Sequence, residues 1–408
     1  MTKKSDAPAI RFKGFSDAWE QREVGDLLIE RSQQAPMSDE YPLMAFIANE
    51  GVAPKGERYD RSALVTDTVN KLYKKTEKGD FIYSSNNLET GSIGLNKYGK
   101  ACISPVYSIF EPTGIADSDF LGRRLVRKDF INAMVKWRQG VIYGQWRIHE
   151  SDFLKIEISV PSVEEQRKIG AYLDQLDNLI TLHQRKFEKL TNVKKSMLEK
   201  MFPQNGSSYP EIRFKGFTDP WEQRKLSEIT DKVTEKNAGL QYVETFTNSA
   251  EFGIISQRDF FDHDIAKLGS LDGYYIVKNE DFVYNPRIST SAPVGPINRN
   301  KLGRTGVMSP LYTVFRPHDI DTTYLEYFFK CGYWHSFMNF NGDSGARSDR
   351  FSIRDNVFFQ MPIPIPDIDE QRKIGELLTC LDNLITLHQR ELEKLQNIKK
   401  SMLEKMFV

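Results

Sequence analysis

The hexapeptide EQRKIG occurs twice in the chain, at residues 165–170 and again at residues 370–375. Each copy opens a longer repeat, because residues 165–202 align with residues 370–407 without a gap, and 30 of the 38 aligned positions are identical. The stretch of chain before each copy has diverged much further. Self-similarity of this kind marks a duplicated architecture. The sequence therefore predicts two units, each with a variable domain followed by a long repeat.

A second, shorter repeat marks the start of each unit. RFKGFSDAWEQR at residues 11–22 returns as RFKGFTDPWEQR at residues 213–224, directly after the first long repeat. By analogy, the N-terminal copy should lie near the end of the second long repeat. The predicted divisions are a first variable domain (1–162), a first long helix (163–202), a linker with a second variable domain (203–367) and a second long helix (368–408).

The long repeats are predicted to be helices that form a coiled coil. Pro161 and Ser162 precede an acidic first turn, the apolar residues are periodic, and neither copy contains an internal proline. The apolar pattern fits heptads in both copies. In the first copy, position a holds Leu173, Ile180, Phe187, Lys194 and Met201, and position d holds Ile169, Leu176, His183, Leu190 and Met197.

Chain reach predicts an antiparallel pair. Each helix spans roughly 60 Å, whereas the polar linker PQNGSSYPEI covers at most about 33 Å when fully extended. The second variable domain must then start near the far end of the first helix. Apolar residues also occupy g positions, which widens the stripe beyond a two-stranded seam and predicts a partner. These candidate partner-binding residues are Tyr172, Leu179, Val193, Leu377, Leu384 and Ile398.

The variable domains are predicted to mix helices and strands. Matched strand-like segments occur in both, and they suggest a shared framework with different loops. The pairs are residues 79–85 and 280–286, residues 103–110 and 308–315 with a proline near the start, and the exit segments 154–161 and 358–366.

Bulk properties restrict the class of protein. Lys plus Arg equals Asp plus Glu, at 56 each, so a nucleic-acid partner must be held by local patches. No segment offers the roughly twenty consecutive apolar residues of a membrane span. The scattered cysteines Cys102, Cys331 and Cys380 suit a reducing compartment and predict no metal site. We expect a cytoplasmic protein without a membrane partner.

Motifs of catalysis are incomplete. YNPRIS at residues 284–289 has Arg287 where the adenine methyltransferase signature has a second proline, and no Gly-rich cofactor loop precedes it. GVAPKGER at residues 51–58 has Glu57 and Arg58 where a phosphate-binding loop requires Lys and Ser or Thr. The chain is therefore predicted not to be an enzyme.

Two acid-free stretches, residues 90–110 and 282–318, favour contact with nucleic acid, although ordinary polar loops would have the same composition. A second pair of loops, residues 141–148 and 341–353, offers side chains suited to bidentate contacts with guanine or adenine. The candidate DNA-binding residues are Asn86, Asn87, Thr90, Ser92, Lys97, Lys100, Tyr143, Gln145, Arg147, Asn285, Arg287, Ser289, Thr290, Arg299, Lys301, Arg304, Arg347 and Arg350.

The two divergent domains, each followed by a matching helix with the EQRKIG and LDNLITLHQR text, resemble the specificity subunit of a Type I restriction-modification system. The resemblance covers nearly the whole chain. It implies an α+β fold in which two target-recognition domains are separated by a long antiparallel two-helix coiled coil, with a pseudo-twofold internal repeat. It also implies that each domain reads half of an asymmetric bipartite site in double-stranded DNA.

The resemblance further implies that the helices hold two methyltransferase subunits, which restriction (motor-nuclease) subunits join. S-adenosylmethionine, ATP and Mg would then act in those partners, and this chain would need no cofactor. A stand-alone DNA-modifying enzyme or a protein-only scaffold are the alternatives.

Overall fold

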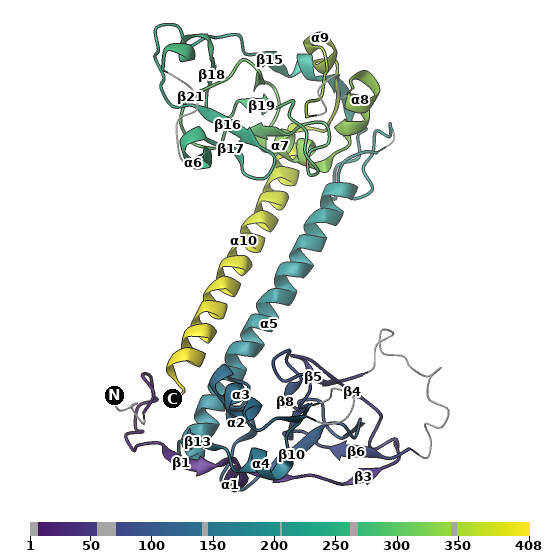
Figure 1. Cartoon of the computed structure of the whole chain (residues 1–408). Helices are drawn as coiled ribbons and strands as arrows, with labels where there is room; N and C mark the ends of the chain where they lie inside the picture. The colour runs from purple at the N-terminus through teal and green to yellow at the C-terminus, as the bar shows by residue number, and fades with distance from the viewer. Residues whose placement is uncertain (1–6, 55–70, 141–145, 205, 262–267, 344–348) are drawn as a thin grey trace. The chain divides into compact units, whose positions relative to one another are not determined.

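The chain forms two units, each with its own core. In a computed structural model, residues 7–54, 71–140, 146–204, 206–261, 268–343 and 349–408 are described (Figure 1). The first unit comprises residues 1–184 and 390–408, and the second comprises residues 185–389. Each unit therefore holds one variable domain, the start of the helix that follows it and the end of the other long helix.

The same four-stranded antiparallel sheet lies at the centre of both variable domains. The strand order is β2-β10-β7-β8 in the first and β15-β22-β19-β20 in the second. The strands are β2 (Leu28–Glu30), β10 (Ser108–Pro112), β7 (Phe81–Tyr83) and β8 (Ile93–Leu95), matched by β15 (Thr230–Lys232), β22 (Thr313–Pro317), β19 (Phe282–Tyr284) and β20 (Ile297–Arg299). Strands β7 and β19 are wholly buried, as expected for central strands. The common order confirms the internal repeat.

The strands predicted at residues 103–110 and 308–315 are each interrupted by a turn. Tyr107 N donates to Ser104 O and Tyr312 N donates to Ser309 O, so a strand ends before the turn and another starts after it. Proline at the start of each turn lacks the N–H that a continuous strand would need.

The remaining strands form smaller sheets. They are β3 (Gln34–Ala35), β6 (Tyr73–Thr76) and β9 (Ala101–Ile103); β4 (Ala45–Ile47) and β5 (Gly51–Ala53); β11 (Gln139–Gly140) and β12 (Trp146–Arg147); β16 (Phe246–Ser249) and β17 (Gly253–Ser256); and β18 (Tyr275–Val277) and β21 (Gly306–Met308).

Short helices pack against the sheets. They are α1 (Val24–Leu27), α2 (Ser118–Arg124), α3 (Lys128–Val135) and α4 (Glu150–Leu154) in the first unit, and α6 (Gln257–Phe261), α7 (Thr322–Cys331), α8 (Trp334–Asn341) and α9 (Asp355–Phe358) in the second, with 3-10 turns at Leu226–Glu228 and Leu268–Gly273. Aromatic side chains such as Phe110, Phe153 and Phe315 fill the cores. In the described parts of the chain, no helix combines the length and apolar character that crossing a membrane requires.

A two-stranded ribbon leads into each long helix. Strand β1 (Glu20–Glu23) pairs with β13 (Glu157–Val160), and β14 (Glu222–Lys225) pairs with β23 (Pro362–Ile365). Helix α5 (Val163–Lys200) and helix α10 (Ile368–Lys405) follow directly (Figure 1). The two repeats of the sequence therefore meet in space, because β1 and β14 belong to the short repeat.

The EQRKIG motif ties each helix to its variable domain. Arg11 donates twice to Glu165, at 2.9 and 2.7 Å, and Arg213 donates twice to Glu370, at 2.8 Å in both bonds. Both carboxylates are buried, where such charge-assisted pairs are strongest.

The next residue of the motif acts on a neighbouring helix. Gln166 Oε1 accepts from Asp117 N at 3.0 Å, and Gln371 Oε1 accepts from Asp321 N at 2.9 Å. These aspartates cap helices α2 and α7 by accepting from Phe120 N and Tyr324 N. One hexapeptide thereby fixes both the start of the short repeat and a capped helix against the start of a long helix.

The two long helices run antiparallel within each unit. Lys399, near the end of α10, forms a 2.5 Å ion pair with Asp177 in the first half of α5. In the second unit, Lys194 near the end of α5 pairs with Asp382 in the first half of α10. The predicted antiparallel coiled coil is confirmed in both units.

The short repeats meet the ends of the long helices. Ile10 N donates to Lys405 O at 3.0 Å in the first unit, and Ile212 N donates to Lys200 O at 2.9 Å in the second. The predicted position of the N-terminal repeat beside the end of the second helix is therefore confirmed.

Candidate nucleic-acid interface

In the first variable domain, two separate candidate loops are brought together. Residues 84–92 connect β7 to β8, and residues 146–148 precede α4. Asn86 Oδ1 accepts from Trp146 N at 2.6 Å, and Ser85 Oγ accepts from Ile148 N at 3.0 Å. The side chains of Asn86 and Arg147 are exposed at this junction, so both are placed to contact a ligand.

Internal bonds hold the shape of loop 84–92. Asn87 O accepts from Thr90 Oγ1 at 3.1 Å and from Ser92 N at 2.9 Å. Asn87 and Thr90 are exposed, whereas Ser92 is buried inside the turn. Arg138 braces the loop by donating to Ser85 O and to both carboxylate oxygens of Glu89. The hydrogen bond from Arg138 lowers the pKa of Glu89.

The second variable domain pairs the equivalent loops. Arg287 and Arg350 face each other as an antiparallel bridge, which Phe351 N extends by donating to Pro286 O at 2.7 Å. Ile288 N also donates to Asp349 O at 3.0 Å. The loop after β19 and the loop before α9 therefore form one continuous surface.

Three buried or half-buried amides support that surface. Asn285 Nδ2 donates to Asn248 O at 2.8 Å, and Asn298 Nδ2 donates to Asn248 Oδ1 at 2.7 Å. The loop then turns through exposed Ser289 and Thr290, with Ser289 Oγ accepting from Ala292 N. The amides leave the backbone after Asn285 in a fixed path, so the exposed polar side chains are preorganised.

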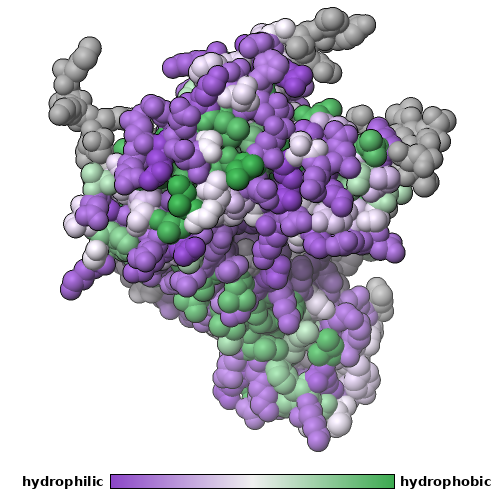
Figure 2. All heavy atoms as spheres, turned by 90° about the horizontal axis from the view of Figure 1, so that it is seen from below, coloured by the Kyte–Doolittle hydropathy of each residue, from purple (hydrophilic) through white to green (hydrophobic). Residues whose placement is uncertain are grey.

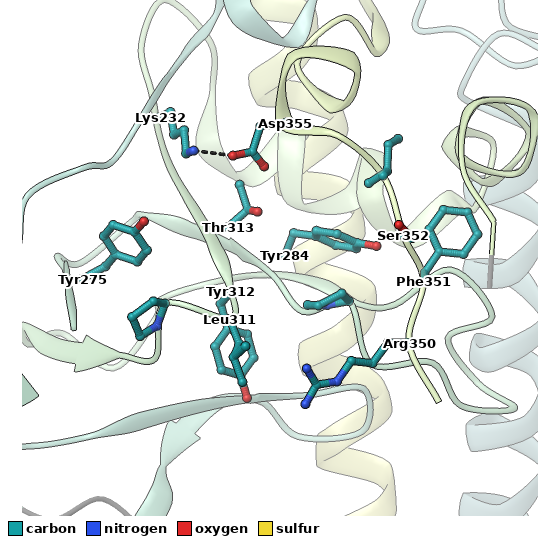
Figure 3. Close-up of a pocket in the computed structure, with 13 residues that line it drawn as sticks. Lys232, Tyr275, Tyr284, Leu311, Tyr312, Thr313, Arg350, Phe351, Ser352 and Asp355 are labelled. Atoms are coloured by element: carbon teal, nitrogen blue, oxygen red, sulfur yellow. Dashed lines mark hydrogen bonds and ion pairs between the residues drawn. The ribbon is translucent and has the colours of Figure 1, made fainter. Parts of the chain in front are cut away.

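A pocket of about 480 Å³ opens beside these loops in the second unit (Figure 3). In the view of Figure 3, Tyr284 lies between the Arg350 side chain and the Lys232–Asp355 ion pair. Tyr312 also lines the pocket. A guanidinium next to aromatic rings can donate to a base edge, and the rings supply apolar contact.

Several candidate cations are bound by carboxylates of their own unit. Arg299, which is nearly buried, contacts Glu280 at 3.0 Å and Glu326 at 2.6 Å. Lys301 also contacts Glu326, and Arg304 makes two 2.8 Å bonds to Glu244. The Arg304 hydrogen bond lowers the pKa of Glu244. These cations stabilise the fold around the loops and are less available for reading bases.

The two candidate lysines of the first unit lie away from the paired loops. Lys97 forms an ion pair with Asp174 of α5 at 3.1 Å. Lys100 pairs with Glu40. Both ammonium groups are half exposed, so a phosphate could still compete for them.

Three arginines remain at the paired loops with uncommitted side chains. Arg147 reaches Glu150 only at 3.7 Å, which is beyond hydrogen-bond distance. Arg287 and Arg350 form no ion pair with any carboxylate in the described residues. The candidates Tyr143, Gln145 and Arg347 lie outside the residues that the structure describes.

The candidate partner-binding residues divide into two sets. Leu179 and Leu384 are exposed at equivalent positions of α5 and α10, each followed one turn later by another exposed leucine, Leu182 or Leu387. The other four pack partly inside their own units. Tyr172 makes an edge contact with Phe12, Ile398 packs on the first core, and Val193 and Leu377 pack on the second.

Sequence patterns gave no sign of the residues that brace the loops. Arg138 is one of many arginines, and Asn248 lies in a hairpin without an unusual composition. Their roles depend on partners more than 30 positions away, which only the fold brings close. No short motif could have identified them.

Comparison with known proteins finds specificity subunits of Type I restriction enzymes that are similar to this chain over nearly its whole length. The Type I restriction enzyme MjaVIII specificity subunit of Methanocaldococcus jannaschii is 24% identical over 408 residues, which covers 94% of this chain and 91% of the relative. The putative MjaX specificity subunit of the same organism is 24% identical over 281 residues, covering 64% of this chain and 60% of the relative.

The fold is shared with a solved structure, that of the Type I restriction-modification S subunit from M. genitalium. The TM-score is 0.55 at 13% identity, with 98% of this chain and 99% of that chain covered. A family model for the type I restriction modification DNA specificity domain matches residues 17–192 and 218–397. These two matches span most of the sequence, so the chain belongs to the family of type I restriction modification DNA specificity domains, of which it carries two copies.

Proposed function

We propose that each variable domain reads one half of an asymmetric bipartite site in double-stranded DNA, and that the chain carries out no catalysis itself. The observation that carries the proposal is the loop pair on the same sheet in both units. The two loops meet through side-chain acceptors in the first domain and through a backbone bridge in the second. Asn86 stands in the first domain where Arg287 stands in the second, whereas Arg147 and Arg350 match. Equivalent loops with unlike base-reading side chains predict two different half-sites.

The reading chemistry follows from the exposed polar groups. Arg287 and Arg350 can each donate two parallel hydrogen bonds to guanine O6 and N7, and Asn86 Nδ2 can donate to adenine N7 while Asn86 Oδ1 accepts from Trp146 N. Phosphate contacts from Lys97 and Lys100 would position the duplex without selecting a sequence.

Two methyltransferase subunits are the proposed partners of the long helices. Leu179 with Leu182, and Leu384 with Leu387, present identical apolar steps on α5 and α10. Two identical apolar surfaces can bind two copies of the same protein. Motor-nuclease subunits would join these copies for restriction. S-adenosylmethionine, ATP and Mg would be bound in the partners, and this chain would bind none of them.

The test is to map methylated adenines in DNA exposed to the assembled complex. We expect methylation within two unlike half-sites at a fixed separation, and neither methylation nor cleavage by the chain alone. Methylation without a bipartite consensus, or activity of the isolated chain, would contradict the proposal.

A matched pair of variants locates the reading surface. Arg287→Ala should weaken binding about 5- to 100-fold and relax selectivity in one half-site only, because a bidentate contact discriminates by about 1–3 kcal/mol. Arg304→Ala is the control, since its guanidinium is bound to Glu244. Binding constants for duplexes mutated in either half-site provide the measurement. Equal effects of the two variants would place the surface elsewhere.

A further inference from the structure

Two tryptophans are exposed at one place in the first variable domain. The chain has five tryptophans, of which Trp19, Trp221 and Trp334 are buried. Trp137 and Trp146 are 41% and 49% exposed. Such large apolar side chains are normally well buried, and exposed ones concentrate at binding sites. In the space-filling view of Figure 2, the visible surface is mostly hydrophilic, with hydrophobic residues in small groups.

Both exposed tryptophans flank the paired loops of the first domain. Gly140 pairs with Trp146 and Gln139 pairs with Arg147 in the β11–β12 ribbon, which Trp137 precedes. Trp146 N donates directly to Asn86 Oδ1. Trp146 therefore stands between two proposed base-reading residues, Asn86 and Arg147.

The second domain also has an exposed aromatic residue in the segment that leads into its loop pair. Met134 of α3 and Met338 of α8 are both completely buried, and Trp137 and Phe340 follow them by three and two positions. Phe340 is 90% exposed. The chain then joins the loop pair, because Asp343 exchanges two hydrogen bonds with Ser352, next to Phe351. Each domain therefore presents an exposed aromatic side chain shortly before its loop pair, Trp146 in the first and Phe340 in the second, although the two positions are not equivalent.

We propose that Trp146 and Phe340 act as wedges, each inserting at a base step of its own half-site and unstacking it. The proposal rests on the function proposed above and adds DNA distortion to base reading. Apolar side chains inserted at a base step kink duplexes in many proteins. Methyltransferases must also extrude their target base from the stack, so unstacking nearby lowers the cost of that step in the partner subunit.

The surroundings favour DNA over a protein partner. The neighbours of Trp146 are an amide and a guanidinium, which are the groups that bond base edges. The exposed leucines of α5 and α10 form a separate apolar surface for protein subunits.

The experiment uses the assembled complex and duplexes with 2-aminopurine at successive positions of each half-site. We expect the fluorescence to rise at one step of each half-site on binding. Trp146→Ala should remove the rise in the first half-site and weaken specific binding about 5- to 100-fold. Trp146→Phe should keep most of the fluorescence rise and most of the binding affinity. Phe340→Ala should act only on the second half-site.

Ile29→Ala is the matched control. Ile29 is an exposed apolar residue of β2 that pairs with Glu111, whereas Tyr83, which leads into loop 84–92, pairs with Ser108 at the other end of β10. This variant should change neither signal.

The outcomes separate the two proposals. Specific binding without any fluorescence rise in the wild-type complex, or a rise that survives Trp146→Ala, overturns the wedge and leaves the DNA-reading function standing. Trp146→Ala that impairs assembly with the partner subunits, with DNA binding unchanged, also overturns it and assigns the hairpin to protein docking. A wild-type complex that binds no bipartite site would instead refute the proposed function.

Discussion

The glycine of EQRKIG has little free space in either copy. A Cβ on Gly170 would lie 2.7 Å from Asp117 Oδ1 and 3.0 Å from Asp119 Cβ. On Gly375 the nearest atoms would be Cγ2 and Cβ of Thr323, at 3.1 and 3.2 Å. At Gly170, the side chain that caps α2 therefore leaves no room for a Cβ. At Gly375, a Cβ would fit after a small shift of Thr323.

Alanine at these two glycines should have unequal effects. Gly170→Ala should reduce the free energy of unfolding by about 1–3 kcal/mol, because the cap must move. For Gly375→Ala, the cost of a small shift is opposed by the better helix propensity of alanine, about 1 kcal/mol. Thermal or denaturant unfolding of the two variants measures the difference. A larger loss for Gly375→Ala would contradict the packing described.

For single residues, the sequence shows which positions matter but not which contacts make them matter. Self-comparison singles out Glu165 and Glu370, but their partners Arg11 and Arg213 are more than 150 positions away. The same distance hides the difference between the two sites, where Trp221 also donates to Glu370 at 3.2 Å. Pairing across such separations follows from the ribbon and cannot be read from local patterns.

Among the elements, the long helices are the best predicted, because their heptads are local and uninterrupted. The strands are predicted less well. Residues 103–110 look like one strand, yet the bond from Tyr107 N to Ser104 O divides them. The contact between the two loops could not be predicted from the sequence, since the bond from Trp146 to Asn86 uses a backbone N–H that every residue except proline supplies.

The exposed leucines lead to a prediction for the helices. Leu179→Glu should weaken assembly with the methyltransferase subunits at least about tenfold, because a charge would enter an apolar contact. The variable domains should stay folded, since Leu179 is exposed. Size-exclusion chromatography of the mixed subunits measures assembly.

Thr181→Glu provides the control for that variant. Thr181 is exposed and lies about 200° around the helix from Leu179. It should leave assembly unchanged. An intact complex with Leu179→Glu, or equal loss with Thr181→Glu, would count against the proposed seat.

For the whole molecule, the hydrogen bonds from Ile10 to Lys405 and from Ile212 to Lys200 allow the order of the halves to be exchanged. A permuted chain that joins Val408 to Ala7 by a short Gly/Ser linker and opens at Gly206 should fold and bind the same site. The new termini fall in an exposed stretch outside any helix or strand, where breaks are tolerated. Circular dichroism and DNA binding test this expectation.

A second permutant, opened between Lys186 and Phe187, should fail both tests, because the break interrupts α5. If the two permutants behave alike, the short repeats do not close the chain as described.

The duplication was the part of the molecule most open to prediction, since it requires only that the chain be compared with itself. The surface proposed to read bases was the hardest part to predict, because Arg287 and Arg350 are far apart in the sequence and meet only after folding. The division of the units has one more consequence. Each core includes the last turns of the long helix encoded in the opposite half of the chain. The sequences of those last turns are nearly the same in α5 and α10. A gene cut down to a single half could thus yield a product that completes itself by associating with its twin, and such a homodimer would read a palindrome.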